Sequence, residues 1–167
     1  MADFGYPIPG SGRTFNRIYV GIVDVKLGYA MAINKMTIGF NLGYSYFRVS
    51  HKVLETNSTM MLLSPGLTLG YEFTAAKKIF IHPIIKCGYD FITFKGKDTD
   101  GNSLPSFRQS GLSLTPAITA GYFFTKKIGV GVNGSYKIIF QHFGSKAVQE
   151  ESTIRITGLG FTILYKL

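Results

Sequence analysis

Residues 79–94 read Ile-Phe-Ile-His-Pro-Ile-Ile-Lys-Cys-Gly-Tyr-Asp-Phe-Ile-Thr-Phe, and the alternation in this stretch decides the fold. Successive side chains of a β-strand point to opposite faces, so odd and even positions fall on different sides. The even side carries charge at Lys86 and Asp90 and a histidine at His82, whereas the odd side carries none. The odd side is apolar and comprises Ile79, Ile81, Ile85, Cys87, Tyr89 and Phe91.

The same period of two recurs in six further stretches: 18–33, 37–50, 59–73, 112–124, 128–143 and a last one that ends at residue 167. Glycine, at 20 of 167 residues, is spread through these apolar stretches, although glycine disfavours helix interiors by about 1 kcal/mol relative to alanine. No apolar run approaches the ~18–20 residues of a membrane helix. The sequence therefore predicts an all-β protein, as a single domain over residues 1–167.

The placement of charge predicts which face points outward. Across all stretches, the face with the large apolar side chains carries only Arg48 and Arg155 as charges. The opposite face is rich in Gly, Ala, Ser and Thr, which suit a narrow polar lumen and do not fill an apolar cavity. An apolar exterior with a polar interior is the pattern of a membrane barrel. We therefore predict a lumen charge network formed by Asp24, Lys26, Glu72, Lys86, Asp90 and Lys137.

Strand length and connections indicate an antiparallel, up-and-down transmembrane β-barrel. Short turns at residues 34–35, 74–78 and 125–127 alternate with longer segments at 50–58, 95–110 and 144–152, as in outer-membrane barrels. Seven strands are clear, but barrels of this kind use an even number. We expect eight, with residues 1–17 forming a short or truncated first strand and a loop from Pro7; closure by another chain is the third alternative. Mid-strand prolines at 65, 83 and 116 predict β-bulges.

Aromatic residues and the C-terminal stretch add detail to this prediction. Tyrosines and phenylalanines near the short turns are expected to form a lipid-facing girdle: Tyr29, Tyr71, Phe73, Tyr122 and Phe124. Together, these features resemble the small eight-stranded outer-membrane barrels of the OmpA/OmpX-like class. The closing alternation resembles the assembly signal of that class, although it ends in leucine: Phe161, Ile163, Tyr165 and Leu167.

The resemblance implies location in a bacterial outer membrane and a role as a structural anchor, an interaction platform or, less often, a lipid-modifying enzyme. We expect a non-enzymatic structural or interaction subunit, with no catalytic residues, no metal site and no cofactor. The main alternative is a lipid A deacylase-like enzyme, for which His142, Ser145 and Glu150 or Glu151 supply the residue types. A small porin-like pore, or a soluble lipocalin-like ligand binder if the apolar face points inward, is a further alternative.

The chain is basic, with 18 Lys or Arg against 9 Asp or Glu, a net charge of +9. Many of the lysines cluster at the short turns, where they can meet anionic lipid headgroups. The expected partners are outer-membrane lipids, the barrel-assembly machinery and other envelope proteins. Nucleic acid is not expected, because the aromatic side chains that would stack on bases belong to the lipid face.

Overall fold

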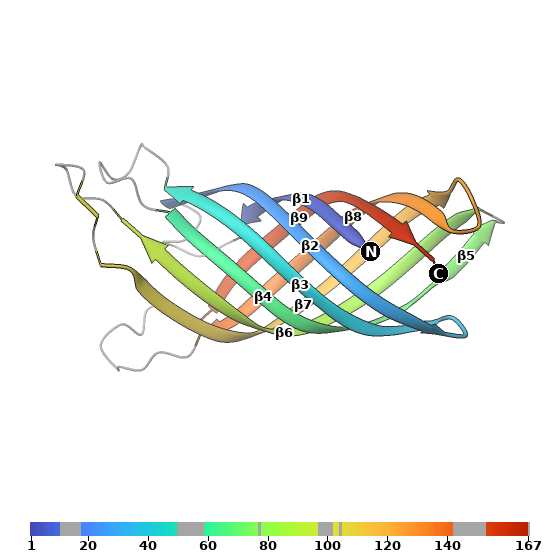
Figure 1. The fold of residues 1–167 in the computed structure, drawn as a ribbon, viewed down its shortest axis with the longest axis horizontal. Coiled ribbons are helices and arrows are strands. Elements are labelled where there is room, and N and C mark those ends of the chain that lie inside the picture. The colour runs from blue at the N-terminus through green and yellow to red at the C-terminus, as the bar shows by residue number, and fades with distance from the viewer. Residues whose placement is uncertain are drawn as a thin grey trace.

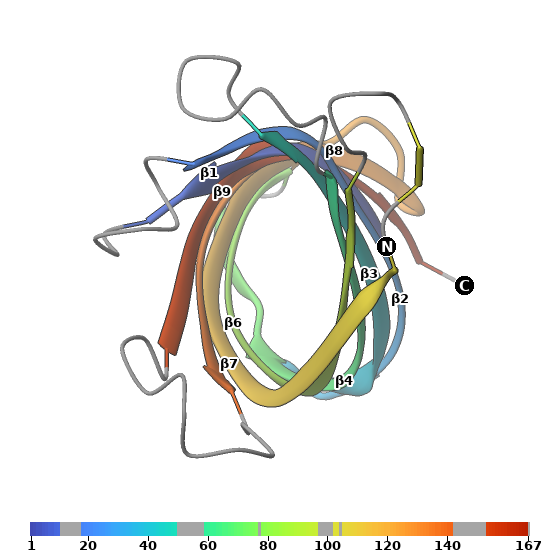
Figure 2. The ribbon, with the colours of Figure 1, turned by 90° about the vertical axis from the view of Figure 1, so that its left-hand side faces the viewer.

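The computed structural model describes residues 1–10, 18–49, 59–76, 78–96, 102–103, 105–141 and 153–166. They form a closed antiparallel barrel, seen from the side in Figure 1 and from its loop end in Figure 2. The predicted all-β fold is confirmed. The strands are β1 (Ala2–Pro9), β2 (Tyr19–Ile33), β3 (Met36–Val49), β4 (Thr59–Tyr71), β5 (Phe73–Ala76), β6 (Ile79–Lys95), β7 (Phe107–Phe123), β8 (Ile128–Gln141) and β9 (Thr153–Tyr165).

Eight strand positions surround the lumen. Except for β4 and β5, neighbours along the chain pair with each other. In addition, β1 pairs with β9 and β4 pairs with β6, which closes the barrel. The short β5 takes up the β4 position again after a break at Glu72, since Gly70 pairs with Ile84 and Phe73 with Ile81 of the same strand β6. The predicted eight-stranded barrel is therefore confirmed, with β5 as an extra short segment.

The expected N-terminal stub is a full member of the barrel. Strand β1 pairs with β9 from Ala2 to Pro9 and with β2 from Ala2 to Gly5. The prediction of a loop from Pro7 is therefore wrong, because Pro7 and Pro9 lie in the strand. Pairing with β2 stops at Gly5, so neither proline interrupts a ladder on that side.

The bulges predicted at the mid-strand prolines are also absent. Pairing of β4 with β6 skips Pro65, and pairing of β7 with β8 skips Pro116, and both resume in the same register. Pro83 pairs with Ile118 on β7, while its other side faces the break between β4 and β5. A proline lacks only one N–H, so a local gap toward one neighbour accommodates it without an inserted residue.

A register shift does occur in β2, between Gly21 and Val23 opposite β3. The extra residue reverses the alternation, as a β-bulge does. Tyr19, which the unbroken alternation places on the apolar outer face, instead turns inward and lies 6.2 Å from the Phe94 ring, centroid to centroid.

At the opposite end of β2, Asn34 takes φ of 58° in the two-residue turn to β3, a conformation that asparagine tolerates.

The exterior of the barrel is apolar. Large apolar side chains are the most exposed on it, with Phe40 at 70% and Phe161 at 69% exposure, while polar and charged groups are buried inside. This arrangement is the reverse of a soluble barrel and matches a lipid-facing surface. In the described part of the chain, no helix is long and apolar enough to cross a membrane.

The tight approach of β1 to β2 generates the first prediction. A Cβ added at Gly21 would lie 1.6 Å from the carbonyl oxygen of Pro7, closer than any real contact. We expect Gly21→Ala to lower the free energy of unfolding by at least ~1–3 kcal/mol, the usual cost of forcing atoms into a packed site. Urea unfolding in detergent micelles measures the change. Gly134→Ala is the matched control, because the nearest atom would be 3.9 Å away; equal stability losses would contradict the prediction.

Candidate functional site

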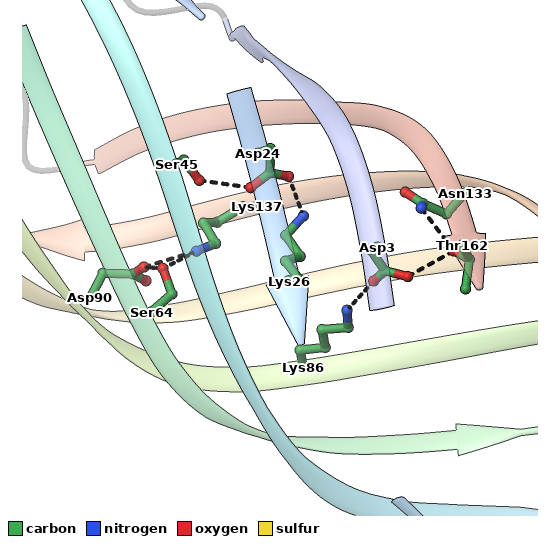
Figure 3. Close-up of polar contacts among 10 residues, drawn as sticks. All are labelled: Asp3, Asp24, Lys26, Ser45, Ser64, Lys86, Asp90, Asn133, Lys137 and Thr162. Carbon is green, nitrogen blue, oxygen red and sulfur yellow. Dashed lines mark hydrogen bonds and ion pairs between the residues drawn. The ribbon is translucent and has the colours of Figure 1, made fainter. Parts of the chain in front are cut away.

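The middle of the lumen holds three acids and three lysines with their side chains directed inward, drawn in Figure 3 with the polar groups around them. They come from β1, β2, β6 and β8, so four strands meet here. The six residues are Asp3, Asp24, Lys26, Lys86, Asp90 and Lys137. Their formal charges cancel.

The pair of Asp90 and Lys137 is the most deeply buried. Lys137 Nζ lies 2.8 Å from Asp90 Oδ1, and the Asp90 residue has no exposed surface. Ser64 Oγ joins the pair by donating to Asp90 Oδ1 and accepting from Lys137 Nζ at 2.6 Å. A buried charge is tolerated when it is both paired and hydrogen-bonded, and this triad provides both.

A second pair connects the two ends of the chain to the middle strands. Lys86 Nζ on β6 lies 3.1 Å from Asp3 Oδ2 on β1. Asp3 Oδ1 also accepts a hydrogen bond of 2.7 Å from Thr162 Oγ1 on β9, which in turn accepts one of 2.9 Å from Asn133 on β8. This chain of contacts spans the seam where β1 closes the barrel (Figure 3).

The third pair lies on β2 itself. Lys26 Nζ is 2.6 Å from Asp24 Oδ2, two residues along the same face of the strand. Ser45 on β3 donates to Asp24 Oδ1 at 2.8 Å. The space left between the three lysines is a cavity of about 20 Å³. That volume accommodates about one water molecule.

Toward the loop end, the lumen changes from charged to apolar. Inward side chains of β3, β4, β6, β8 and β9 pack into one buried cluster, and Tyr19 and Phe94 pack against it. The cluster consists of Phe47, Met60, Leu62, Ile92, Ile139, Ile154 and Ile156. We call this cluster the loop-side plug. It lies between the charged layer and the loop end of the barrel.

Toward the short turns, a polar layer and then a pair of aromatic rings follow. His82 Nε2 and Thr37 Oγ1 are 2.8 Å apart in the polar layer. Beyond them, the buried rings of Phe80 and Phe123 lie 4.7 Å apart, centroid to centroid. The charged layer is therefore enclosed by apolar side chains on both sides.

Five of the six residues predicted for the lumen network lie in this layer. Glu72 does not: it lies at the short-turn mouth and pairs there with Lys166 at 2.7 Å. Asp3 was not predicted as a lumen residue, because the first residues were interpreted as a stub. The alternation of Asp3 and Gly5 with the exposed Phe4 and Tyr6 is the signal that identifies this segment as a strand.

The five predicted girdle residues are all exposed on the outer face. Four of them form two neighbouring pairs, with ring centroids 4.6 Å and 5.5 Å apart. These pairs are Tyr71 with Phe73 and Tyr122 with Phe124, while Tyr29 lies on β2. Of the assembly signal, three residues point outward on β9: Phe161, Ile163 and Tyr165. Leu167 lies outside the described residues.

The residues considered for catalysis, His142, Ser145, Glu150 and Glu151, lie outside the described residues. Within the described ranges, no group of three or more His, Cys, Asp or Glu side chains is arranged to hold a metal ion. The chemistry that the described lumen supports is charge pairing.

Comparison with solved structures identifies the fold. Neisserial surface protein A (NspA) superposes with a TM-score of 0.64 at 14% sequence identity, over 99% of this chain and 94% of NspA. The chain has the fold of the small outer-membrane β-barrels. The attachment invasion locus protein Ail of Yersinia pestis, in complex with the heparin analogue sucrose octasulfate, gives a TM-score of 0.54 at 12% identity, over 97% and 94% of the two chains.

The outer membrane enzyme PagL also matches, over 98% of this chain and 99% of PagL, at 18% sequence identity. The TM-score of 0.43 is too low for this match to bear on activity. No protein-family model and no curated protein sequence matches the chain. The resemblance to the OmpA/OmpX-like class is thus confirmed as a matter of fold. Since the neighbours are outer-membrane proteins and the exterior is apolar, both findings support the expected outer-membrane location.

The enclosed pair of Lys86 and Asp3 generates the second prediction. Removal of one partner from a buried ion pair typically costs about 3–5 kcal/mol, because the remaining charge is left uncompensated. We therefore expect Lys86→Met to lower the free energy of unfolding in detergent by an amount in that range. The double variant Asp3→Asn/Lys86→Met should recover most of the loss, because it removes both charges.

Lys166→Met is the control for this measurement, because its pair with Glu72 is partly exposed and such pairs contribute only ~0–1 kcal/mol. Unchanged stability in Lys86→Met, or a double variant less stable than Lys86→Met, would show that the lumen charges are not energetically coupled.

Proposed function

We propose that this protein is a non-catalytic, non-conducting barrel that serves as a structural or interaction subunit of the outer membrane. The observation that carries the proposal is the closed interior. A neutral layer of ion pairs lies between the loop-side plug and the rings of Phe80 and Phe123, with a cavity of about 20 Å³ at its centre. Such an interior gives stability, and it leaves the outer face and the two ends as the working surfaces.

The distribution of charge supports the same assignment. The lumen layer is neutral, and the segments 11–17, 50–58, 97–101 and 142–152 together contain five Lys or Arg and five Asp or Glu. The net charge of +9 therefore comes from the rest of the chain. At the loop-side strand ends, four exposed residues on the outer face carry part of this positive charge: Arg48, Lys95, Arg108 and Arg155.

Among the described residues, the short-turn end carries five lysines and Glu72, and Lys77, which lies outside the described residues, accounts for the remaining charge. The five lysines are Lys35, Lys78, Lys126, Lys127 and Lys166. Both ends of the apolar exterior are thus cationic, a distribution suited to lipid phosphates and acidic partner surfaces. This supports an interaction role for the ends of the barrel.

A conductance measurement tests the closed interior. In planar bilayers we expect the wild-type barrel to show no steady, charge-selective current, because ions cannot pass the loop-side plug. The Lys86→Met variant is expected to show no such current either. A stable current that changes its selectivity in Lys86→Met would contradict the proposal and favour a small pore.

An assay on lipid substrates tests the absence of catalysis. Purified barrel is incubated with lipid A and with phospholipid, and the lipids are examined by mass spectrometry. We expect no change in lipid mass with the wild type or with His142→Ala. A mass change that the wild type produces and His142→Ala does not would establish a lipid-modifying enzyme in place of the structural role.

A further inference from the structure

A hollow of about 520 Å³ opens at the short-turn mouth of the barrel, outside the enclosed lumen. It lies where the break at Glu72, the start of β6, the turn from β7 to β8 and the end of β9 meet. Three lysines from three separate segments line it, together with one acid and one buried ring: Lys78, Lys126, Lys166, Glu72 and Phe123.

Two of the lysines are held in place by contacts that the structure shows. Lys166 Nζ lies 2.7 Å from Glu72 Oε1 and 4.3 Å from the centroid of the Phe123 ring. Lys78 Nζ lies 5.6 Å from the centroid of the Tyr122 ring. Cations over aromatic faces are attracted by the ring electrons, so the Lys166 ammonium is held beside Phe123, which lines the hollow, and the Lys78 ammonium is held beside Tyr122 on the adjoining outer face.

The charge of the hollow indicates the kind of ligand. Three lysines and one glutamate give a formal net charge of +2 among its lining residues. Lysines that line one hollow from different segments can supply the charged donors that phosphate oxygens accept from. Glu72 lowers the net charge and occupies Lys166, which favours a singly charged phosphodiester over a more highly charged anion.

The position of the hollow indicates where that phosphodiester comes from. Phe124 lines the hollow and is also exposed on the outer face, next to Tyr122. These two rings lie where aromatic side chains of membrane proteins meet the interface between hydrocarbon and headgroups. A headgroup in the hollow would therefore leave its acyl chains against the lipid-facing wall.

We propose that this hollow binds the phosphate of an anionic glycerophospholipid from the leaflet on the short-turn side. Lys78 and Lys126 contact the phosphate oxygens, Lys166 is positioned by Glu72 and Phe123, and the acyl chains follow the outer face past Tyr122 and Phe124. The site goes beyond the structural role proposed above, because it assigns a specific lipid to one end of the barrel.

Native mass spectrometry of the full chain in zwitterionic detergent tests the site with phosphatidylglycerol as the probe and phosphatidylcholine as the neutral comparison. We expect one phosphatidylglycerol to be retained in preference to phosphatidylcholine. Lys78→Gln/Lys126→Gln should weaken its binding about tenfold, in keeping with the loss of charge-assisted contacts. Glu72→Gln should tighten binding, because it removes the acid from the hollow and frees Lys166.

Lys35→Gln is the matched control, since it removes a lysine from the same end that does not line the hollow. It should change binding less than twofold. An equal loss in Lys35→Gln would overturn the site in favour of diffuse attraction, and so would equal retention of phosphatidylcholine. Inorganic phosphate should not displace the lipid at millimolar concentration; displacement would show a site for free phosphate. Unchanged heat-modifiable migration of each variant establishes that it is folded.

Discussion

The constraint on which this structure depends is that a closed barrel in a bilayer gives each strand residue only two environments. One is hydrocarbon, which excludes charge, and the other is a lumen only a few side chains wide. Charged residues of the spanning region are therefore directed into the narrow lumen, as Lys86, Asp90 and Lys137 are. There they must pair, because little water is available to solvate them.

The apolar layers at either side of the charges make that pairing more stringent. The loop-side plug and the rings of Phe80 and Phe123 place apolar surroundings on both sides of the ion pairs, and a low local dielectric strengthens each attraction and raises the cost of an unpaired charge. Equal numbers of acids and lysines satisfy this condition. The interior thus stabilises one arrangement of the strands.

The outward faces of the strands could be predicted from sequence because alternation is local: Lys86 and Asp90 are enough to orient β6. The partners of these charges could not, because Asp3 and Lys86 are 83 residues apart and meet only through the pairing of eight strand positions. Tyr19 was misplaced because one inserted residue reverses the alternation and leaves no mark in the residue types. Glu72 was assigned to the network because it falls on the inward side of the alternation, but it follows the last residue of β4 at the short-turn mouth, where its partner is Lys166.

The positions of the charged residues decide what the net charge of the chain implies about its partners. A total of +9 in a soluble domain suggests attraction to a polyanion such as nucleic acid. Here the lumen charges cancel, and the excess lies at the two ends of an apolar wall, on residues such as Arg48 and Arg155 on one side and Lys78 and Lys126 on the other. The cationic residues at each end of the apolar wall are attracted to the phosphates of the nearer leaflet. A shift of the barrel along its axis would move the cations of one end away from their phosphates and the cations of the other end into hydrocarbon. The basic residues at both ends of the barrel therefore oppose a shift of the barrel along the membrane normal.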